Sequence, residues 1–159
     1  MNSAKVAVII PTHEGSDFIK RSVISVLNQN YTDIQVIVVD DNGRNSDEQL
    51  KTANILKKYI DNKQIDYIVH EKSKNGSSAR NTGAFYTECE YISFLDDDDE
   101  LLPDKIEKQV QFLDNNPNIM LTWCGGNILV NDVLSYVRLP EENQVANLYE
   151  VLLHHNHGC

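Results

Sequence analysis

Continuous β-branched runs that alternate with amphipathic segments constrain this chain more than any other feature of its sequence. Residues 5–11 (KVAVIIP) and 34–39 (IQVIVV) are apolar almost throughout, as expected for strands of a parallel sheet covered on both faces. Between them, Ile19, Val23 and Val26 recur at helical spacing and form one apolar stripe. Strand, helix and strand joined by short links predict an α/β domain with right-handed crossovers.

The same alternation continues to the end of the chain. The remaining predicted elements are a helix over about 47–62, a strand over 65–70, a helix from Ser77 or Ser78 to about 88, a strand over 91–95, a helix from Pro103 to 116, a strand over 119–130 interrupted at Gly125 and Gly126, and a short helix over 145–153. Ser16 or Asp17 suits the N-cap of the first helix. The chain ends at Cys159 without the stop signal of a finished domain, and we expect a truncated domain.

The composition is that of one globular domain. The chain has 159 residues, of which 41% are hydrophobic and 24% charged. Its formal net charge of −10 argues against nucleic acid as a partner, because binding to the phosphate backbone needs a basic surface. A nucleotide is not excluded, since a divalent cation can bridge carboxylates to a diphosphate.

The cysteines and the lack of a long apolar run bear on the compartment. Cys89, Cys124 and Cys159 are odd in number and far apart, which favours a reducing compartment without a disulfide framework. No apolar run approaches the length of a membrane span. We therefore expect a cytoplasmic protein, either free in the cytoplasm or at the inner face of the membrane. A zinc site is not expected from the final histidines (His154, His155, His157), whose spacing fits no standard pattern.

Polar side chains gather at the carboxyl ends of the predicted strands, which is the edge where open α/β sheets bind ligands. They are Thr12, His13 and Glu14 after the first strand, Asp40 and Asp41 after the second, and Asp96 to Asp99 after the fourth, with Arg80 on the same side. Several polar clusters at one edge predict a binding site there more strongly than any single cluster does.

The acidic run that follows the fourth strand predicts a metal site. Adjacent carboxylates at the mouth of a sheet repel one another, and a hard divalent cation relieves that repulsion. In an extended backbone Asp96 and Asp98 project to one face, a spacing that suits Mg²⁺ or Mn²⁺. The alternative is a solvated acidic loop that stabilises the start of the helix at Pro103. The position of the run directly after an apolar strand favours the metal.

Asp41 and Arg80 each have two interpretations. Asp41 can accept a hydrogen bond from a base or a ribose hydroxyl, whereas the Asp-Asn-Gly sequence around it also forms an Asx-type turn readily. Arg80, one turn into a predicted helix, can neutralise phosphate or hold the acidic cluster in shape. An ordinary capped helix, with Gly83 and Ala84 packed closely on the sheet, is the plain alternative for that segment.

Four segments in register resemble the inverting glycosyltransferases of family 2 with the GT-A fold. They are VIIPTHEG, SVLNQNYTDIQVIVVDDN, NGSSARNTGA and YISFLDDDDELLPDKIEKQ, and together they span about residues 5–109. The resemblance implies a Rossmann-like, mostly parallel sheet flanked by helices. It also implies that residues 1–159 form the donor part, which binds the nucleotide-sugar, and that the acceptor part is largely absent.

The resemblance implies roles for individual residues. Thr12, His13 and Glu14 would line the nucleotide pocket, with His13 stacked on the base. Asp41 would contact the base (uracil), Arg80 would lie near the nucleotide, and Asp97 would lie near the ribose. Asp96 and Asp98 would be the acids of the D-x-D motif that hold Mg²⁺ or Mn²⁺, with Asp98 as the direct ligand. Glu14 departs from the asparagine common at its position, and Gly43 and Arg44 depart from the usual end of the second motif.

The activity that the resemblance implies is transfer of a sugar from a UDP-sugar to a hydroxyl of a saccharide or lipid-linked acceptor, with inversion and metal assistance, in polysaccharide or glycan biosynthesis. The catalytic base is expected beyond Cys159, because Glu141 and Glu142 come too early to match it. Two alternatives remain open: a donor-binding fragment without transferase activity, and a receiver-like signalling domain that binds metal or phosphate. The second needs a lysine at a late strand end, which the sequence does not offer.

Overall fold

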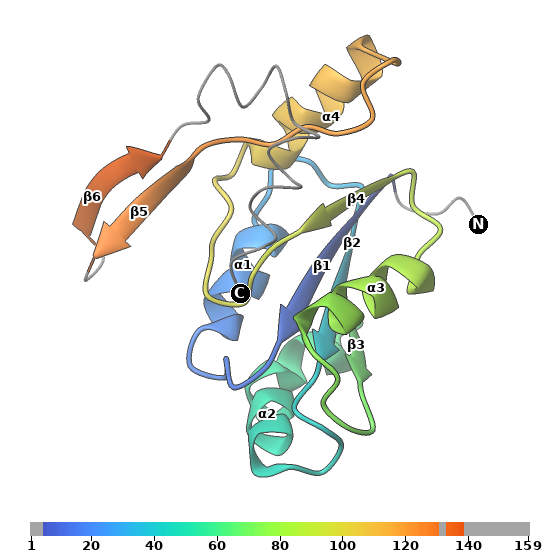
Figure 1. The fold of residues 1–159 in the computed structure, drawn as a ribbon, viewed down its shortest axis with the longest axis vertical. Helices are drawn as coiled ribbons and strands as arrows, with labels where there is room; N and C mark the ends of the chain where they lie inside the picture. Colours follow the sequence, from blue (N-terminus) through green and yellow to red (C-terminus); the bar gives the residue numbers. More distant parts are fainter. Residues whose placement is uncertain (1–4, 131–132, 139–159) are drawn as a thin grey trace. The chain divides into compact units, whose positions relative to one another are not determined.

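The computed structural model, which describes residues 5–130 and 133–138, has a strand at each long β-branched run of the sequence. The chain divides into two compact units between Gln111 and Phe112. The elements of the first unit are β1 (Val6–Thr12), α1 (Ile19–Leu27), β2 (Ile34–Asp40), α2 (Asp47–Asp61), β3 (Asp66–Val69), α3 (Gly76–Tyr86), β4 (Tyr91–Phe94) and the greater part of α4 (Lys105–Asn115), which crosses the boundary (Figure 1).

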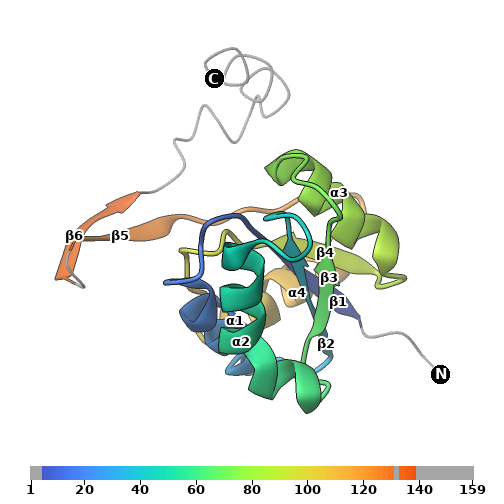
Figure 2. The ribbon, with the colours of Figure 1, turned by 90° about the horizontal axis from the view of Figure 1, so that it is seen from below.

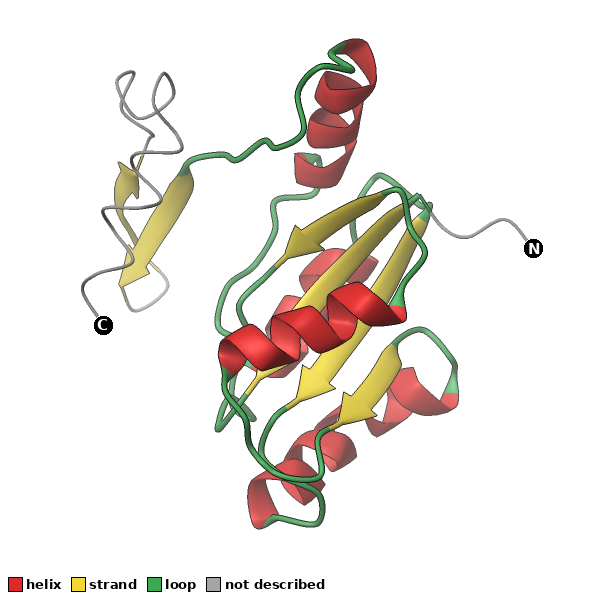
Figure 3. Cartoon of the chain, turned by 45° about the vertical axis from the view of Figure 1, so that its right-hand side comes forward, coloured by secondary structure: helices red, strands yellow, loops and turns green. Residues whose placement is uncertain are grey.

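The first unit is built on a parallel sheet of four strands in the order β3-β2-β1-β4. Its arrows all point the same way in Figure 3. The register pairs Thr12 with Asp40, Asp40 with Val69, and Ile9 with Phe94. The carboxyl ends of these strands therefore lie along one edge of the sheet, which is where the sequence analysis expects the binding site.

Helices cover both faces of the sheet, as the apolar strands require. Figure 2 shows α3 on one side and α1 and α2 on the other. The apolar cluster on the α3 side is Ala7, Ile9, Ile37, Val39 and Ala79, and the larger cluster on the opposite side draws on β1, β2, α1, α2 and α4. Gly83 brings α3 close to the sheet, because a Cβ at this residue would lie 2.5 Å from Ile9 Cγ2. This confirms the close packing predicted for Gly83.

The N-caps predicted for two helices are wrong. The N-cap of α1 is Phe18, without a side-chain cap, rather than Ser16 or Asp17. The Gly15 carbonyl accepts from two backbone N–H groups there, and the Ser16 hydroxyl donates to Glu48 instead (2.9 Å). The N-cap of α3 is Asn75, whose side chain accepts from the Ser78 backbone N–H. Local sequence alone does not choose between neighbouring residues that all cap well.

The start of α4 is fixed by a distant residue rather than by Pro103. The helix begins at Lys105, and the Ile106 backbone N–H donates to the Gln29 side chain of the loop after α1 (3.1 Å). No helix among the described residues is long and apolar enough to cross a membrane. Cys89 and Cys124 are free thiols in this part of the chain.

The second unit contains an antiparallel hairpin of β5 (Gly126–Val130) and β6 (Val133–Arg138), with an irregular register between Ile128 and Leu129. The strand predicted over 119–130 is thus wrong for its first half, since the ladder begins only at the second of the two glycines. The helix predicted over 145–153, the final histidines, Glu141, Glu142 and Cys159 lie outside the described residues.

Candidate functional site

A pocket of about 250 Å³ lies at the carboxyl edge of the sheet. Its lining residues are Pro11, Thr12, His13, Asp41, Gly76, Ala79, Arg80, Asp96, Asp97 and Asp98. Asp40 and Asp99 do not line it. The residues to which the family resemblance assigns a role are brought together there, with the exception of Glu14. That residue is exposed just after β1, with a positive φ of 56°, and its backbone N–H donates to the Asn42 side chain (2.8 Å).

The acidic run is a turn and not an extended segment. The backbone N–H of Asp99 donates to the carbonyl of Asp96 (3.1 Å), which closes the turn over Asp97 and Asp98. The prediction that Asp96 and Asp98 project from an extended backbone to one face is therefore wrong. A turn separates the directions of neighbouring side chains, so each acid of the run has its own surroundings.

Asp97 is directed back toward the end of β1. Its Oδ2 accepts from the Thr12 hydroxyl (2.6 Å), and its carboxylate also accepts from the His13 backbone N–H. Burial and then the charge of Asp98 raise the pKa of Asp97, although these hydrogen bonds act against the shift. Gly15 makes room for the carboxylate, because a Cβ on this residue would lie only 1.8 Å from Asp97 Oδ2.

Asp96 and Asp98 differ in whether a cation of the protein neutralises them. Arg80 Nη2 donates to Asp96 Oδ1 at 2.5 Å, so the interpretation that Arg80 holds the acidic cluster in shape fits this structure. Asp98 is exposed and makes no hydrogen bond or ion pair within the described part of the chain. Burial and the charges of Asp98 and Asp96 raise the pKa of Asp99. Among the described residues the pocket is thus lined by four aspartates, Asp41, Asp96, Asp97 and Asp98, and by one arginine, Arg80.

The donor set suits a cation shared with a ligand better than a cage made by the protein alone. No group of three or more His, Cys, Asp or Glu side chains in residues 5–130 and 133–138 is arranged to hold a metal ion. Mg²⁺ and Mn²⁺ sites of nucleotide enzymes commonly use one or two carboxylates, with phosphate oxygens and waters completing the shell. Asp98 fits such a site as it stands, and Asp96 would join it only after leaving Arg80.

Polar side chains of α1 and the residues after it hold the backbone of the acidic loop. The Ser22 hydroxyl donates to the Asp97 carbonyl (2.7 Å), and the Gln29 side chain donates to the Leu102 carbonyl (2.8 Å). The Ser25 hydroxyl accepts from the Leu101 backbone N–H (3.0 Å). These residues were not predicted from the sequence, although they recur about one helical turn apart beside an apolar stripe.

Asp40 and Asp41 have different partners although they are adjacent. Asp40 is fully buried; its Oδ1 accepts from the Asn42 backbone N–H (2.9 Å), and its Oδ2 accepts from the Tyr67 hydroxyl (2.5 Å). Burial, and next the bond to Asp40, raise the pKa of Tyr67. The Asx-type turn considered for this sequence is therefore made by Asp40, which leaves Asp41 for another role.

Asp41 binds the loop that precedes α3. Its carboxylate accepts from the Ser73 hydroxyl (3.1 Å) and from the backbone N–H groups of Lys74 (2.9 Å) and Asn75 (2.9 Å), and it contacts His70 Nδ1 at 2.6 Å. Burial raises the pKa of Asp41, but these hydrogen bonds outweigh it and hold the pKa below its usual value. Since a carboxylate has about four lone pairs, the base contact predicted for Asp41 has no free acceptor in this structure.

His70 and Thr82 complete this contact and were missed by the sequence analysis. His70 is 6% exposed, and its Nε2 lies 2.8 Å from Thr82 Oγ1 on α3. A single histidine at a strand end carries no signal that separates this role from an ordinary core residue. The partners lie 29 and 12 residues away, so only the fold reveals them.

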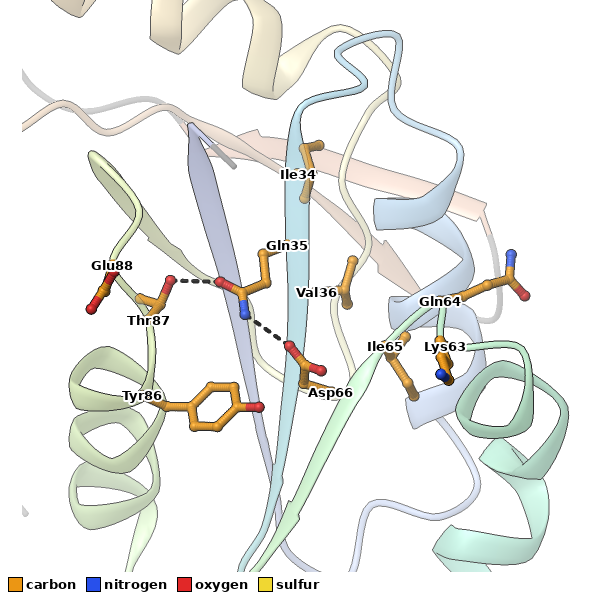
Figure 4. Close-up of a pocket in the computed structure, with 10 residues that line it drawn as sticks. All are labelled: Ile34, Gln35, Val36, Lys63, Gln64, Ile65, Asp66, Tyr86, Thr87 and Glu88. Atoms are coloured by element: carbon orange, nitrogen blue, oxygen red, sulfur yellow. Dashed lines mark hydrogen bonds between the residues drawn. The ribbon is translucent and has the colours of Figure 1, made fainter. Parts of the chain in front are cut away.

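A second depression, of about 600 Å³, lies at the opposite edge of the sheet, where β2 and β3 begin (Figure 4). Its Gln35 side chain accepts from the Thr87 hydroxyl (2.6 Å) and donates to Asp66 (2.8 Å). These polar groups already satisfy one another, and the depression contains none of the residues predicted for function. The pocket at the carboxyl edge is therefore the candidate site.

Comparison with known proteins agrees with the geometry. The sequence matches the model of the family described as "Glycosyl transferase family 2" over residues 7–151. It is 31% identical over 155 residues to an uncharacterized glycosyltransferase of Haemophilus influenzae, covering 91% of this chain and 60% of the relative. It is also 33% identical over 138 residues to one of Methanocaldococcus jannaschii, covering 81% of this chain and 46% of that relative. The chain thus spans about half the length of these relatives.

Solved structures share the fold. The structure is similar to S. aureus TarS 1-349 in complex with UDP-GlcNAc (TM-score 0.61, 26% identity, 71% of this chain and 32% of that chain). It is also similar to the mannosyltransferase PcManGT of Pyrobaculum calidifontis in complex with GDP-Man and Mn²⁺ (TM-score 0.60, 20% identity, 69% and 32%). These similarities confirm the predicted fold class, an α/β fold with a parallel sheet flanked by helices.

Proposed function

Because the chain belongs to glycosyl transferase family 2, we propose that its carboxyl-edge pocket binds a nucleotide-sugar donor, specifically a UDP-sugar, together with Mg²⁺ or Mn²⁺. The proposed activity is transfer of the sugar to an acceptor hydroxyl, with inversion at the anomeric carbon. TarS supports the choice of UDP, since it is 26% identical and its complexes hold UDP-GlcNAc or UDP. Because the chain spans 60% of its Haemophilus relative, the activity of the whole protein is part of the proposal.

The observation that carries the proposal is the charge arrangement of the pocket. Within the described residues Asp98 presents a carboxylate without a hydrogen bond or ion pair, and Arg80, in the first turns of α3, lines the same pocket while paired with Asp96. A diphosphate with a divalent cation is complementary to this pattern, because the cation would contact Asp98 and the phosphate oxygens would accept from Arg80. When bound, the cation would supply charge stabilisation to the departing nucleoside diphosphate.

The remaining pocket residues are proposed to hold the nucleoside. The exposed imidazole of His13 is available to stack on the base, and Thr12 keeps Asp97 in place beside the site of the ribose. Glu14, beside the pocket on the same loop, would contact the nucleotide from its rim. The acceptor is proposed to be a saccharide or a lipid-linked saccharide, and no residue described here is assigned as the catalytic base.

Calorimetry with UDP in the presence and absence of Mn²⁺ tests the donor proposal. We expect UDP to bind the wild-type chain with Mn²⁺ and to bind at least ten times more weakly without it. Asp98→Asn should remove this dependence on Mn²⁺. Asp33→Asn, which removes one exposed carboxylate at the opposite edge of the sheet, should bind as the wild type does.

Three outcomes would count against the proposal in different ways. Failure to bind UDP, GDP or any other nucleoside diphosphate with Mn²⁺ would refute the donor site itself. Preference for GDP would correct the base. Metal-dependent binding without transfer, measured with the full-length protein and a panel of donors and acceptors, would favour a donor-binding module. Membership of the family already removes the receiver-like signalling domain as an alternative.

A further inference from the structure

A buried chain of contacts connects the sheet to the wall of the donor pocket. It runs from Asp41 Oδ1 to His70 Nδ1 (2.6 Å) and from His70 Nε2 to Thr82 Oγ1 (2.8 Å), and Asp41 and His70 are 2% and 6% exposed. We propose that His70 is a positioning residue of the donor site, which holds the loop 71–75 and helix α3 so that Arg80 faces the acidic run. The identity of the ligand rests on the proposed function, whereas the positioning role of His70 rests on the contacts themselves.

Asp41 holds the loop 71–75 that precedes α3. The Asp41 carboxylate accepts from the backbone N–H groups of Lys74 and Asn75, which fixes the path of the loop just before α3. Asn75 has a φ of 145°, a conformation that residues other than glycine rarely adopt. Its side chain also caps α3 by accepting from the Ser78 backbone N–H (2.9 Å). The start of α3 therefore depends on a strained residue that Asp41 holds in place.

The first turns of α3, which follow this loop directly, form part of the pocket wall. Gly76, Ala79 and Arg80, in the first turns of α3, all line the pocket together with Asp41. A shift of this helix end moves the Arg80 guanidinium relative to Asp96, its partner at 2.5 Å. The wall of the pocket and the Asp41 network are thus parts of one continuous segment.

The imidazole of His70 is suited to connecting Asp41 with Thr82. Neutral imidazole donates from one ring nitrogen and accepts at the other, on opposite sides of the ring. Nδ1 of His70 donates to the Asp41 carboxylate, and Nε2 makes a hydrogen bond with the Thr82 hydroxyl. His70 thereby connects the end of β2 to the middle of α3 through a buried side chain. Its ring nitrogens are not available to a ligand, and its role is to position other residues.

Thr82→Val tests this inference, because it removes one hydroxyl that does not line the pocket. We expect the dissociation constant of UDP with Mn²⁺ to rise about three- to tenfold. Thr87→Val is the matched control: it removes one hydroxyl, bonded to Gln35, just after the far end of α3. Thr87→Val should lower Tm about as much as Thr82→Val does and leave the affinity for UDP within about twofold of the wild-type value.

His70 variants extend the test. His70→Phe, which loses both contacts, should weaken the binding of UDP more than Thr82→Val does. His70→Gln, which can remake one of the contacts, should have an affinity for UDP between those of His70→Phe and the wild type. Equal UDP affinity of wild type, Thr82→Val and His70→Phe would overturn the inference. So would a loss of affinity in Thr87→Val as large as that in Thr82→Val, since the effect would then follow stability alone.

Hydrogen exchange separates this inference from the proposed function. The backbone amides of Lys74 and Asn75 should exchange faster in Thr82→Val than in Thr87→Val, in the absence of any ligand. If the wild-type chain binds no nucleoside diphosphate, the donor proposal fails, and the exchange result still decides whether His70 holds the loop. Unchanged exchange at both amides would overturn the positioning role.

Discussion

At the scale of single residues, the run of four aspartates shows that identical side chains acquire separate tasks from their neighbours. Asp97 is held by Thr12, Asp96 is paired with Arg80, and Asp98 makes no hydrogen bond or ion pair within residues 5–130 and 133–138. The sequence predicted that these residues and Thr12 would meet, because strand ends of a parallel sheet share an edge. It did not predict their separate partners, which depend on the turn over Asp97 and Asp98 and on α3.

Gly15 gives the first prediction at this scale. Gly15→Ala should lower the free energy of unfolding by about 1–3 kcal/mol, because the new methyl group would overlap Asp97 and force it away from Thr12. UDP affinity should fall with it. Gly126→Ala, where no atom lies within 4 Å of an added Cβ, is the control. Equal stability of the two variants in urea unfolding would contradict the predicted contact.

Asp98→Asn should stabilise the chain when no cation is present. The charge of Asp98 raises the pKa of both Asp97 and Asp99. A raised pKa means that the folded state favours the protonated acid, so stability falls as pH rises above about 4 and through the raised values. Removing the charge should therefore raise Tm at pH 7 by about 1–4 °C, since exposed like charges are worth up to about 1 kcal/mol.

The pH dependence supplies the check on that variant. Thermal unfolding from pH 4 to pH 8 should show a smaller loss of stability in Asp98→Asn than in the wild type. As the pH is lowered further below 4 and Asp97 and Asp99 become protonated in the folded and the unfolded state, the two Tm values should converge. A constant difference across the whole range would mean that another property of the substitution causes it.

At the scale of elements, α1 and the loop after it support the site although they contribute no residue to the pocket lining. Gln29→Ala should cost about 2–3 kcal/mol of stability, because it leaves the Leu102 carbonyl and the Ile106 N–H without their partner. It should also loosen the acidic loop and weaken Mn²⁺-dependent binding of UDP. Gln64→Ala, at an exposed position, is the control for urea unfolding and calorimetry. An equal, small effect of both variants would contradict the role of Gln29.

Elements were predictable from the sequence where one pattern determined them. The apolar periods of β1, β2 and α1 were sufficient because both faces of the strands and one face of the helix are buried. The starts of α3 and α4 were not, since Asn75 competes with Ser77 and Ser78 as a cap and Gln29 lies 77 residues from Ile106. β5 was predicted as the second half of the strand over 119–130, whereas β6 was missed because this hairpin exposes apolar side chains on more than one face.

At the scale of the whole molecule, charge opposes the proposed donor. The chain carries a formal net charge of −10, and a nucleoside diphosphate is also an anion. Without a divalent cation, raising NaCl from 20 to 300 mM should therefore increase UDP affinity by about two- to fivefold, since salt screens the repulsion. With saturating Mn²⁺ the increase should disappear. Calorimetry that shows UDP affinity falling with salt in both conditions would contradict this expectation.

The ion pair between Arg80 and Asp96 also has a thermodynamic consequence. If the phosphates of a donor draw Arg80 away, Asp96 becomes a second carboxylate available to the cation beside Asp98. The nucleotide would then strengthen cation binding, and by linkage the cation would strengthen nucleotide binding by the same factor. The ion pair that connects α3 to the acidic run would thus make two ligands of opposite charge bind cooperatively.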